Sequence, residues 1–134
     1  MRALMSKDNR EFPAAHSSRA RTVLLVDDEP SIRRLLSGAL TRQGLNVVEA
    51  GDGTEAVEAF HGASGDVDLL ITDMRMPRLG GRGLIRALRS RRPDLKVLCI
   101  TGFPPNVSAD LDVAMLVKPF TCHDLRTPVG SLLS

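Results

Sequence analysis

Short apolar segments recur along the chain at positions that predict five β-strands. Residues 23–26 are all apolar, which is typical of a strand buried on both faces of a parallel sheet. The other four segments are rich in apolar and β-branched residues and are flanked within two residues by glycine, proline or aspartate. They comprise residues 46–50, 67–72, 96–101 and 113–117.

Between these strands, apolar residues recur every three or four positions, which predicts amphipathic helices. A first helix is expected at residues 30–43, a shorter one at residues 54–61 and a third at about residues 82–91. A last helix begins near Cys122, and Pro128 is expected to kink or shorten it. The buried stripe expected for the first helix consists of Ile32, Leu35, Leu36, Ala39 and Leu40.

The segment between the fourth and fifth strands is short for a complete helix. It has 11 residues, 102–112, and includes Pro104 and Pro105. About two turns of helix fit, at residues 106–112. We therefore expect a shortened fourth helix.

Strands that alternate with helices predict an α/β fold with a doubly wound parallel sheet. The length of 134 residues, with 43% hydrophobic and 25% charged residues, suits one domain with a single proper core. The two cysteines form neither a disulfide framework nor a metal set, and Cys99 lies inside an apolar run, as a small core residue would.

Charge is unevenly distributed. Residues 1–21 carry five Lys/Arg and two acids, which predicts a flexible, mildly basic leader before a domain at residues 22–134. The remainder carries 13 basic and 14 acidic residues, so bulk attraction to nucleic acid is not expected. No run approaches the roughly 20 apolar residues of a membrane helix, and the first residues lack a secretory signal. These features predict a cytoplasmic protein.

Reactive side chains follow four of the predicted strands. Asp27 and Asp28 follow the first strand, Asp73 follows the third, Thr101 ends the fourth and Lys118 follows the fifth. The carboxyl ends of parallel strands share one edge of the sheet, where ligands bind. Three carboxylates gathered there repel one another unless a cation lies between them, and oxygen-only ligands favour Mg²⁺.

Each of these residues alone has a structural explanation. An aspartate after a strand often caps a helix, a threonine often simply fills a strand, and a lysine is usually solvated. The arrival of all five groups at one edge favours the functional interpretation.

Four motifs carry a family resemblance: VDDE at 26–29, TDMRMP at 72–77, ITG at 100–102 and VKPF at 117–120. Over residues 22–127 the sequence resembles the receiver domain of two-component response regulators. The resemblance implies a flavodoxin-like strand order 2-1-3-4-5 in a three-layer α/β/α arrangement. It also implies a Mg²⁺-dependent transfer of a phosphoryl group from a phosphohistidine to Asp73.

Roles for the other site residues follow from the same resemblance. Asp28 would bind Mg²⁺ directly, Asp27 directly or through water, and the backbone carbonyl of Arg75 would complete the protein ligands. Lys118 and Thr101 would contact phosphoryl oxygens, and the bond between Lys118 and Pro119 is expected to be cis. Such a protein is a switch that catalyses its own phosphoryl transfer and slow dephosphorylation.

The expected partners are a sensor histidine kinase or a histidine phosphotransfer domain and an unidentified downstream protein. Direct contact with nucleic acid or membrane is not expected. The formation of a weak homodimer is left as an alternative to a monomer. We expect the chain to be either a free-standing receiver or the receiver of a hybrid kinase. Met115 stands where the family has an aromatic switch residue. Because the fourth helix is expected to be short, partner contacts are expected around the first helix and fifth strand or at residues 103–112.

Three other function classes fit less well. A phosphohydrolase with an aspartyl nucleophile normally needs an acid two residues after it, where this chain has Arg75. A nucleotide or flavin carrier needs a phosphate-binding turn after the first strand, and here that turn is acidic. The arginines between residues 75 and 92 lack the aromatic platform of a nucleic-acid site.

Overall fold

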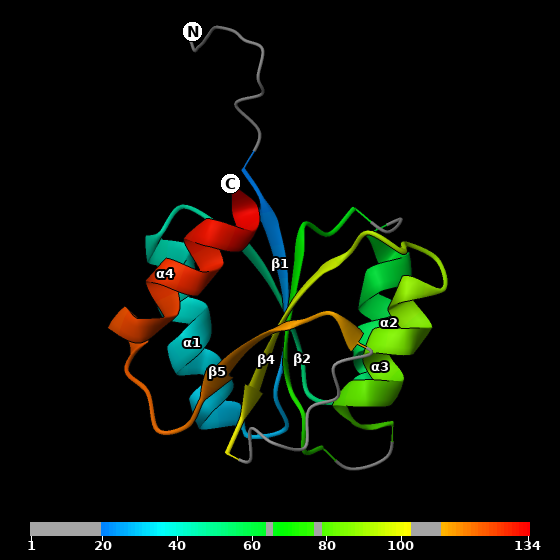
Figure 1. Cartoon of the computed structure of the whole chain (residues 1–134), viewed down its shortest axis with the longest axis horizontal. Coiled ribbons are helices and arrows are strands. Elements are labelled where there is room, and N and C mark those ends of the chain that lie inside the picture. Colours follow the sequence, from blue (N-terminus) through cyan, green and yellow to red (C-terminus); the bar gives the residue numbers. More distant parts are fainter. Residues whose placement is uncertain (1–19, 64–65, 77–78, 103–110) are drawn as a thin grey trace, which may run out of the picture.

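The computed structural model describes residues 20–63, 66–76, 79–102 and 111–134, which form a parallel sheet with helices on both faces (Figure 1). The strands are β1 (Thr22–Val26), β2 (Asn46–Ala50), β3 (Leu69–Asp73), β4 (Lys96–Thr101) and β5 (Ala114–Val117). The helices are α1 (Pro30–Arg42), α2 (Gly53–Gly62), α3 (Gly80–Arg89) and α4 (Cys122–Leu133). The strand order is β2-β1-β3-β4-β5 and every pairing is parallel, which confirms the predicted fold class.

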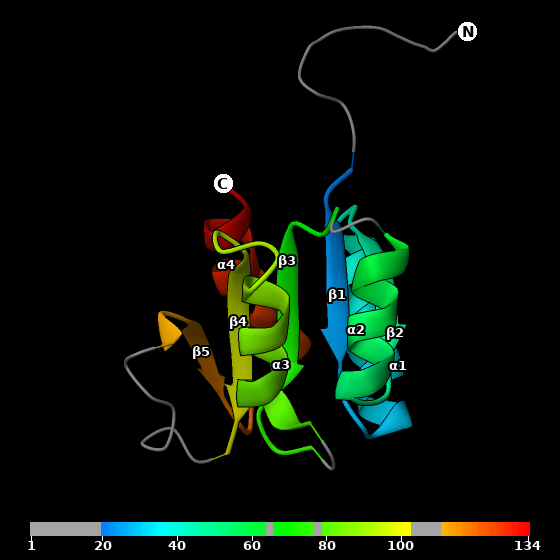
Figure 2. The same ribbon diagram turned by 90° about the vertical axis from the view of Figure 1, so that its right-hand side faces the viewer.

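The sheet divides the interior into two apolar cores. Successive side chains of a strand point to opposite faces, so β1 contributes to both. Leu24 and Val26 face the core formed with α2 and α3. Val23 and Leu25 face the core formed with α1 and α4. Figures 1 and 2 show these two helix pairs on opposite sides of the sheet.

The buried stripe of α1 is shorter than the sequence predicted. Leu36, Ala39 and Leu40 are buried, but Ile32 and Leu35 are 37% and 57% exposed. The first turn of α1, which carries Ile32, extends past the end of β1 (Figure 2). The expectation that Ile32 and Leu35 face the core is therefore wrong.

Pro128 does not end the last helix, contrary to the expected shortening. The helix begins with a capping box in which Thr121 and Asp124 each accept a hydrogen bond from the backbone of the other. Leu125 and Val129 anchor it in the core on either side of the proline. This burial offsets the backbone hydrogen bond that Pro128 cannot donate.

Most of the other helix and strand boundaries lie within two residues of the expected ones. β3 begins at Leu69 rather than at Val67, whose carbonyl accepts a hydrogen bond from the Arg92 side chain instead of joining the sheet. α3 begins at Gly80, whose φ of 70° suits glycine. Residues 106–110 of the predicted fourth helix and nearly all of the predicted leader lie outside the described residues. None of the described helices is long and apolar enough to span a membrane.

The two cysteines differ in accessibility. Cys99 is fully buried in β4, and burial raises the pKa of its thiol to about 11. Cys122, the first residue of α4, is only half-buried.

We predict that iodoacetamide at mildly alkaline pH labels Cys122 of the folded protein and leaves Cys99 unmodified, because a buried thiol with a raised pKa holds little thiolate. Both should react in guanidinium, as measured by peptide mass mapping. Equal labelling rates in the folded protein would contradict this prediction.

Candidate functional site

Three aspartates meet at the carboxyl edge of the sheet and form an acidic cluster (Asp27, Asp28 and Asp73). Asp27 and Asp28 directly follow β1, and Asp73 ends the adjacent strand β3. Carboxylate oxygens of the three residues lie within 4.8 Å of one another. Asp27 and Asp73 are 2% and 6% exposed, whereas Asp28 is exposed to solvent. The parallel pairing of β1 with β3 thus produces the cluster that the strand ends predicted.

Backbone amides hold two of these carboxylates. The N–H of Glu29 donates to Asp27 Oδ1 at 2.9 Å, and the N–H of Arg75 donates to Asp73 Oδ1 at 3.0 Å. The other oxygen of Asp27, Oδ2, is buried and has no hydrogen-bond partner among the residues that the structure describes. A buried carboxylate oxygen without a donor is costly, so a positively charged ligand at this point is favoured.

Lys118 places a positive charge against the acidic cluster. Its Nζ lies 3.1 Å from Asp73 Oδ2. Its backbone N–H donates to the carbonyl of Thr101 at 2.8 Å, which ties the residue after β5 to the end of β4. The bond between Lys118 and Pro119 is cis, as the resemblance implied. Because the Lys118 side chain is 43% exposed, its ammonium is not confined to this one contact.

Thr101 and Gly102 lie beside these charges. Thr101 is buried as the last residue of β4, which pairs with β3 on one side and β5 on the other. Among the described residues other than its chain neighbours, none has an atom within 4 Å of the point where a Cβ on Gly102 would stand. The structure brings the three aspartates and Lys118 together and places Thr101 at the neighbouring strand end.

The acidic cluster holds more negative than positive charge. Burial and the negative charges of Asp73 and Asp28 raise the pKa of Asp27 above its ordinary value, against the opposing effects of the Glu29 N–H and Lys118. A divalent cation would offset both the loss of solvation and the repulsion. Since every side-chain ligand available is a carboxylate oxygen, and one buried oxygen lacks a partner, these residues fit Mg²⁺.

Two residues that support the site were not identified from the sequence. A Cβ on Gly81 would lie 2.8 Å from Met74 Cα and 2.9 Å from the carbonyl oxygen of Asp73, so only glycine allows α3 to approach the Asp73 loop this closely. In the sequence, the only sign of this close approach is the pair of glycines at positions 80 and 81. Arg33 donates from Nη1 to the carbonyl oxygen of Asp27 at 2.7 Å. Nothing in the sequence distinguishes Arg33 from an ordinary solvated arginine of α1.

Comparison with known proteins places this chain in a family. The profile of the response regulator receiver domain matches residues 23–129. The sensor kinase CckA of Brucella abortus is 36% identical over 133 residues, which cover 96% of this chain and 14% of the kinase. The response regulator receiver protein CpdR of the same organism is 34% identical over 118 residues, which cover 84% of this chain and 97% of CpdR. The chain therefore spans a small part of the first relative and nearly all of the second.

Solved structures agree with the sequence matches. The response regulator protein TrrA of Thermotoga maritima, solved in complex with Mg²⁺–BeF, is 33% identical and has a TM-score of 0.74, with 84% of this chain and 99% of that chain covered. The chemotaxis response regulator CheY4 of Vibrio cholerae is 30% identical, with a TM-score of 0.77 over 86% of this chain and all of CheY4. The chain belongs to the response regulator receiver domains, the phosphoryl-accepting switches of two-component signal transduction.

Proposed function

We propose that Asp73 of this receiver domain accepts the phosphoryl group, in a Mg²⁺-dependent reaction with a sensor histidine kinase or a histidine phosphotransfer domain. The observation that carries this assignment is the 3.1 Å contact between Lys118 Nζ and Asp73 Oδ2. Within the acidic cluster, Asp73 has a backbone donor on one carboxylate oxygen and an ammonium on the other. It is therefore both oriented and placed beside a charge that can pair with an incoming phosphoryl group.

Asp27, Asp28 and Asp73 would hold Mg²⁺, and the backbone carbonyl of Arg75 would complete the protein ligands. The partnerless Oδ2 of Asp27 and the short separations within the cluster support this assignment. The similarity to TrrA, whose structure is a complex with Mg²⁺–BeF, supports it independently. When bound, Mg²⁺ supplies neutralisation of negative charge on the transferring phosphoryl oxygens.

The residues of the chain promote the transfer mainly by positioning. A carboxylate oxygen of Asp73 forms a bond to phosphorus while the phosphorus–nitrogen bond of the donor histidine breaks, and the electron pair of that bond returns to the imidazole. Phosphorylation replaces one carboxylate charge with about −1.5 to −2, so the Lys118 ammonium then pairs with a phosphoryl oxygen. The Thr101 hydroxyl donates to another oxygen, and Gly102, which has no side chain, leaves room for the group. Slow hydrolysis of the aspartyl phosphate returns the switch to its resting state.

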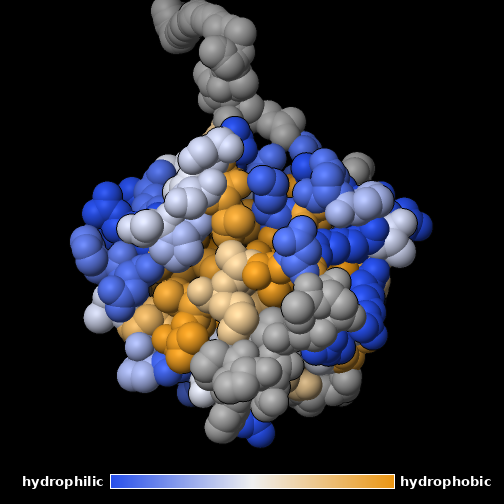
Figure 3. All heavy atoms as spheres, in the orientation of Figure 1, coloured by the Kyte–Doolittle hydropathy of each residue, from blue (hydrophilic) through white to orange (hydrophobic). Residues whose placement is uncertain are grey.

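Exposed apolar residues near the site are proposed to dock the phosphoryl donor. Ile32 and Leu35 lie on the first two turns of α1, which begins directly after the Asp27 loop, and Val117 directly precedes Lys118. Figure 3 shows apolar surface over β5 and toward the lower left, beside α1. A partner that covers these side chains would gain the free energy of their burial while it presents a histidine to Asp73.

Labelling with acetyl phosphate tests the phosphoacceptor. We predict that wild-type protein gains one phosphoryl group in the presence of Mg²⁺ and none in EDTA, as measured by intact mass. Asp73→Asn should remain unlabelled because its amide is not a nucleophile at phosphorus. Asp94→Asn, which changes a carboxylate on the exposed loop before β4, is the matched control and should label normally. Labelling of Asp73→Asn at the wild-type level would refute the assignment.

The charge imbalance predicts that Asp27→Asn stabilises the metal-free domain. The substitution removes a charge that burial and two neighbouring carboxylates disfavour, while its side-chain oxygen can still accept from the Glu29 N–H. We expect a gain of roughly 1 kcal/mol, or about 2–8 °C in the thermal midpoint measured in EDTA.

A matched variant separates this effect from a general loss of charge. Glu58→Gln removes the same charge from an exposed position of α2 and should change stability by less than about 0.5 kcal/mol. Mg²⁺ at about 100 times its dissociation constant should stabilise the wild type by about 2.7 kcal/mol and Asp27→Asn by less. A lower midpoint for Asp27→Asn in EDTA would show that the Asp27 charge stabilises the metal-free fold.

Leu35→Asn tests the docking surface. We predict about tenfold slower transfer from the fastest donor in a panel of autophosphorylated histidine kinases, because an exposed apolar contact is lost. Labelling by acetyl phosphate should be unchanged, since this small donor needs no docking. Leu79→Asn, which alters a 40% exposed leucine before α3 on the other face of the sheet, should affect the two donors equally. The docking proposal fails if Leu35→Asn also leaves the ratio of the two rates unchanged.

A further inference from the structure

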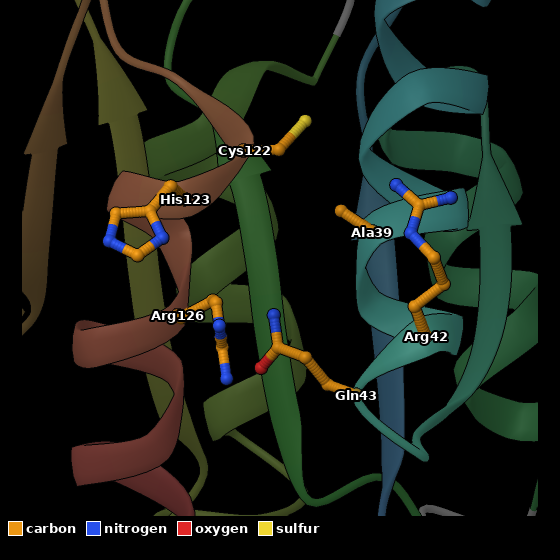
Figure 4. A pocket seen from close by; sticks show the side chains of 6 residues that line it. All are labelled: Ala39, Arg42, Gln43, Cys122, His123 and Arg126. Atoms are coloured by element: carbon orange, nitrogen blue, oxygen red, sulfur yellow. The ribbon is translucent and has the colours of Figure 1, made fainter.

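A pocket with a volume of about 300 Å³ lies between α1 and α4, outside the site described above (Figure 4). Its lining comes from the end of α1 and the first turns of α4, and consists of Ala39, Arg42, Gln43, Cys122, His123 and Arg126. A groove beside it shares four of these residues and adds Thr127. Gln43 lies about 20 Å along α1 from Pro30, the residue at which that helix begins near the acidic cluster.

The pocket is rich in hydrogen-bond donors and has no acidic residue in its lining. Gln43 Nε2 is buried and has no hydrogen-bond partner among the described residues. Within the same ranges, no hydrogen bond or ion pair engages the guanidinium of Arg42 or Arg126. Figure 4 shows Gln43 and Arg126 reaching from facing helices into the space between them. The Gln43 amide and the Arg126 guanidinium thus face one cavity, and Arg42 adds a second guanidinium to its lining.

We propose that this pocket binds a small anion that carries a phosphate group. Guanidinium groups present planar sets of N–H donors that match phosphate oxygens, and here they stand on both walls. A phosphate oxygen would also satisfy Gln43 Nε2, which otherwise stays buried without an acceptor at a cost in free energy. The ring N–H of His123 adds a donor at the rim.

The size and location of the pocket separate this site from the phosphoacceptor site. About 300 Å³ is the lower end of the range for small-molecule sites, so the pocket has room for more than the phosphate group itself. The acidic cluster repels anions in the absence of a cation, whereas the pocket attracts them. Anion binding here therefore requires neither Mg²⁺ nor phosphorylation of Asp73.

Amide NMR of the ¹⁵N-labelled full chain tests the proposal. Inorganic phosphate and adenosine monophosphate are titrated separately at constant ionic strength in EDTA. We expect saturable shifts of the Gln43 side-chain amide and of the backbone amides of residues 122–127, without comparable shifts at residues 26–29 and 72–75. Tighter binding of adenosine monophosphate would identify an organic phosphate as the ligand class, and equal or tighter binding of inorganic phosphate would identify the free ion.

Arginine variants provide the control. Arg126→Gln alone, and Arg42→Gln with Arg126→Gln, should weaken binding about tenfold or more. Arg91→Gln removes an exposed arginine after α3, on the opposite face of the sheet, and should bind like the wild type. Both single variants change exposed side chains, so a dispersed spectrum should confirm that each remains folded. Shifts that do not saturate, that centre elsewhere or that weaken equally in Arg91→Gln would overturn the proposal.

Discussion

Repulsion between carboxylates at the carboxyl edge of the sheet is the constraint on which the rest of this structure depends. The pairing of β1 with β3 fixes Asp27 and Asp73 near each other, and both are buried. Two unit charges about 4 Å apart repel by about 4 kcal/mol at an effective dielectric constant of 20. Lys118 offsets part of this cost through Asp73 Oδ2, but Asp27 Oδ2 still lacks a partner among the described residues. The charges of the acidic cluster therefore favour a bound cation.

The apolar sheet makes that arrangement possible. β3 and all of β1 except Thr22 are buried, so the ends of these strands are held by the two cores rather than by the charged loops themselves. The backbone bond from Lys118 to Thr101 and the close approach of α3 at Gly81 then fix the loops relative to one another. Stability supplied by the cores in this way offsets the electrostatic strain of the site.

The sequence predicted the sheet and the acidic cluster because both follow from local pattern and one topological rule. Continuous apolar runs mark buried strands, and parallel strands bring Asp27, Asp28 and Asp73 to one edge. The strand order itself came from the family resemblance, since hydrophobic periodicity does not specify which strands are neighbours. Helical periodicity identified the apolar stripe of α1, but it does not show where the sheet ends. Ile32 and Leu35 were therefore assigned to the core although they face solvent.

Other features depend on contacts between residues that no local sequence pattern specifies. Arg33, in the first turn of α1, donates to the carbonyl of Asp27, and this contact depends on how the helix is placed against the preceding loop. The basic pocket joins Gln43 to Arg126, which are far apart in the sequence. Likewise, the partnerless oxygen of Asp27 is a property of its surroundings rather than of any motif.

Calorimetric titration of the metal-free protein with Mg²⁺ tests the central claim most directly. If a cation completes the site, one saturable binding event per chain is expected, and Asp28→Ala should abolish it. Asp28 is chosen because it is the exposed member of the acidic cluster, so its removal should disturb the fold least. The absence of saturable binding, or binding with unchanged affinity in Asp28→Ala, would contradict it.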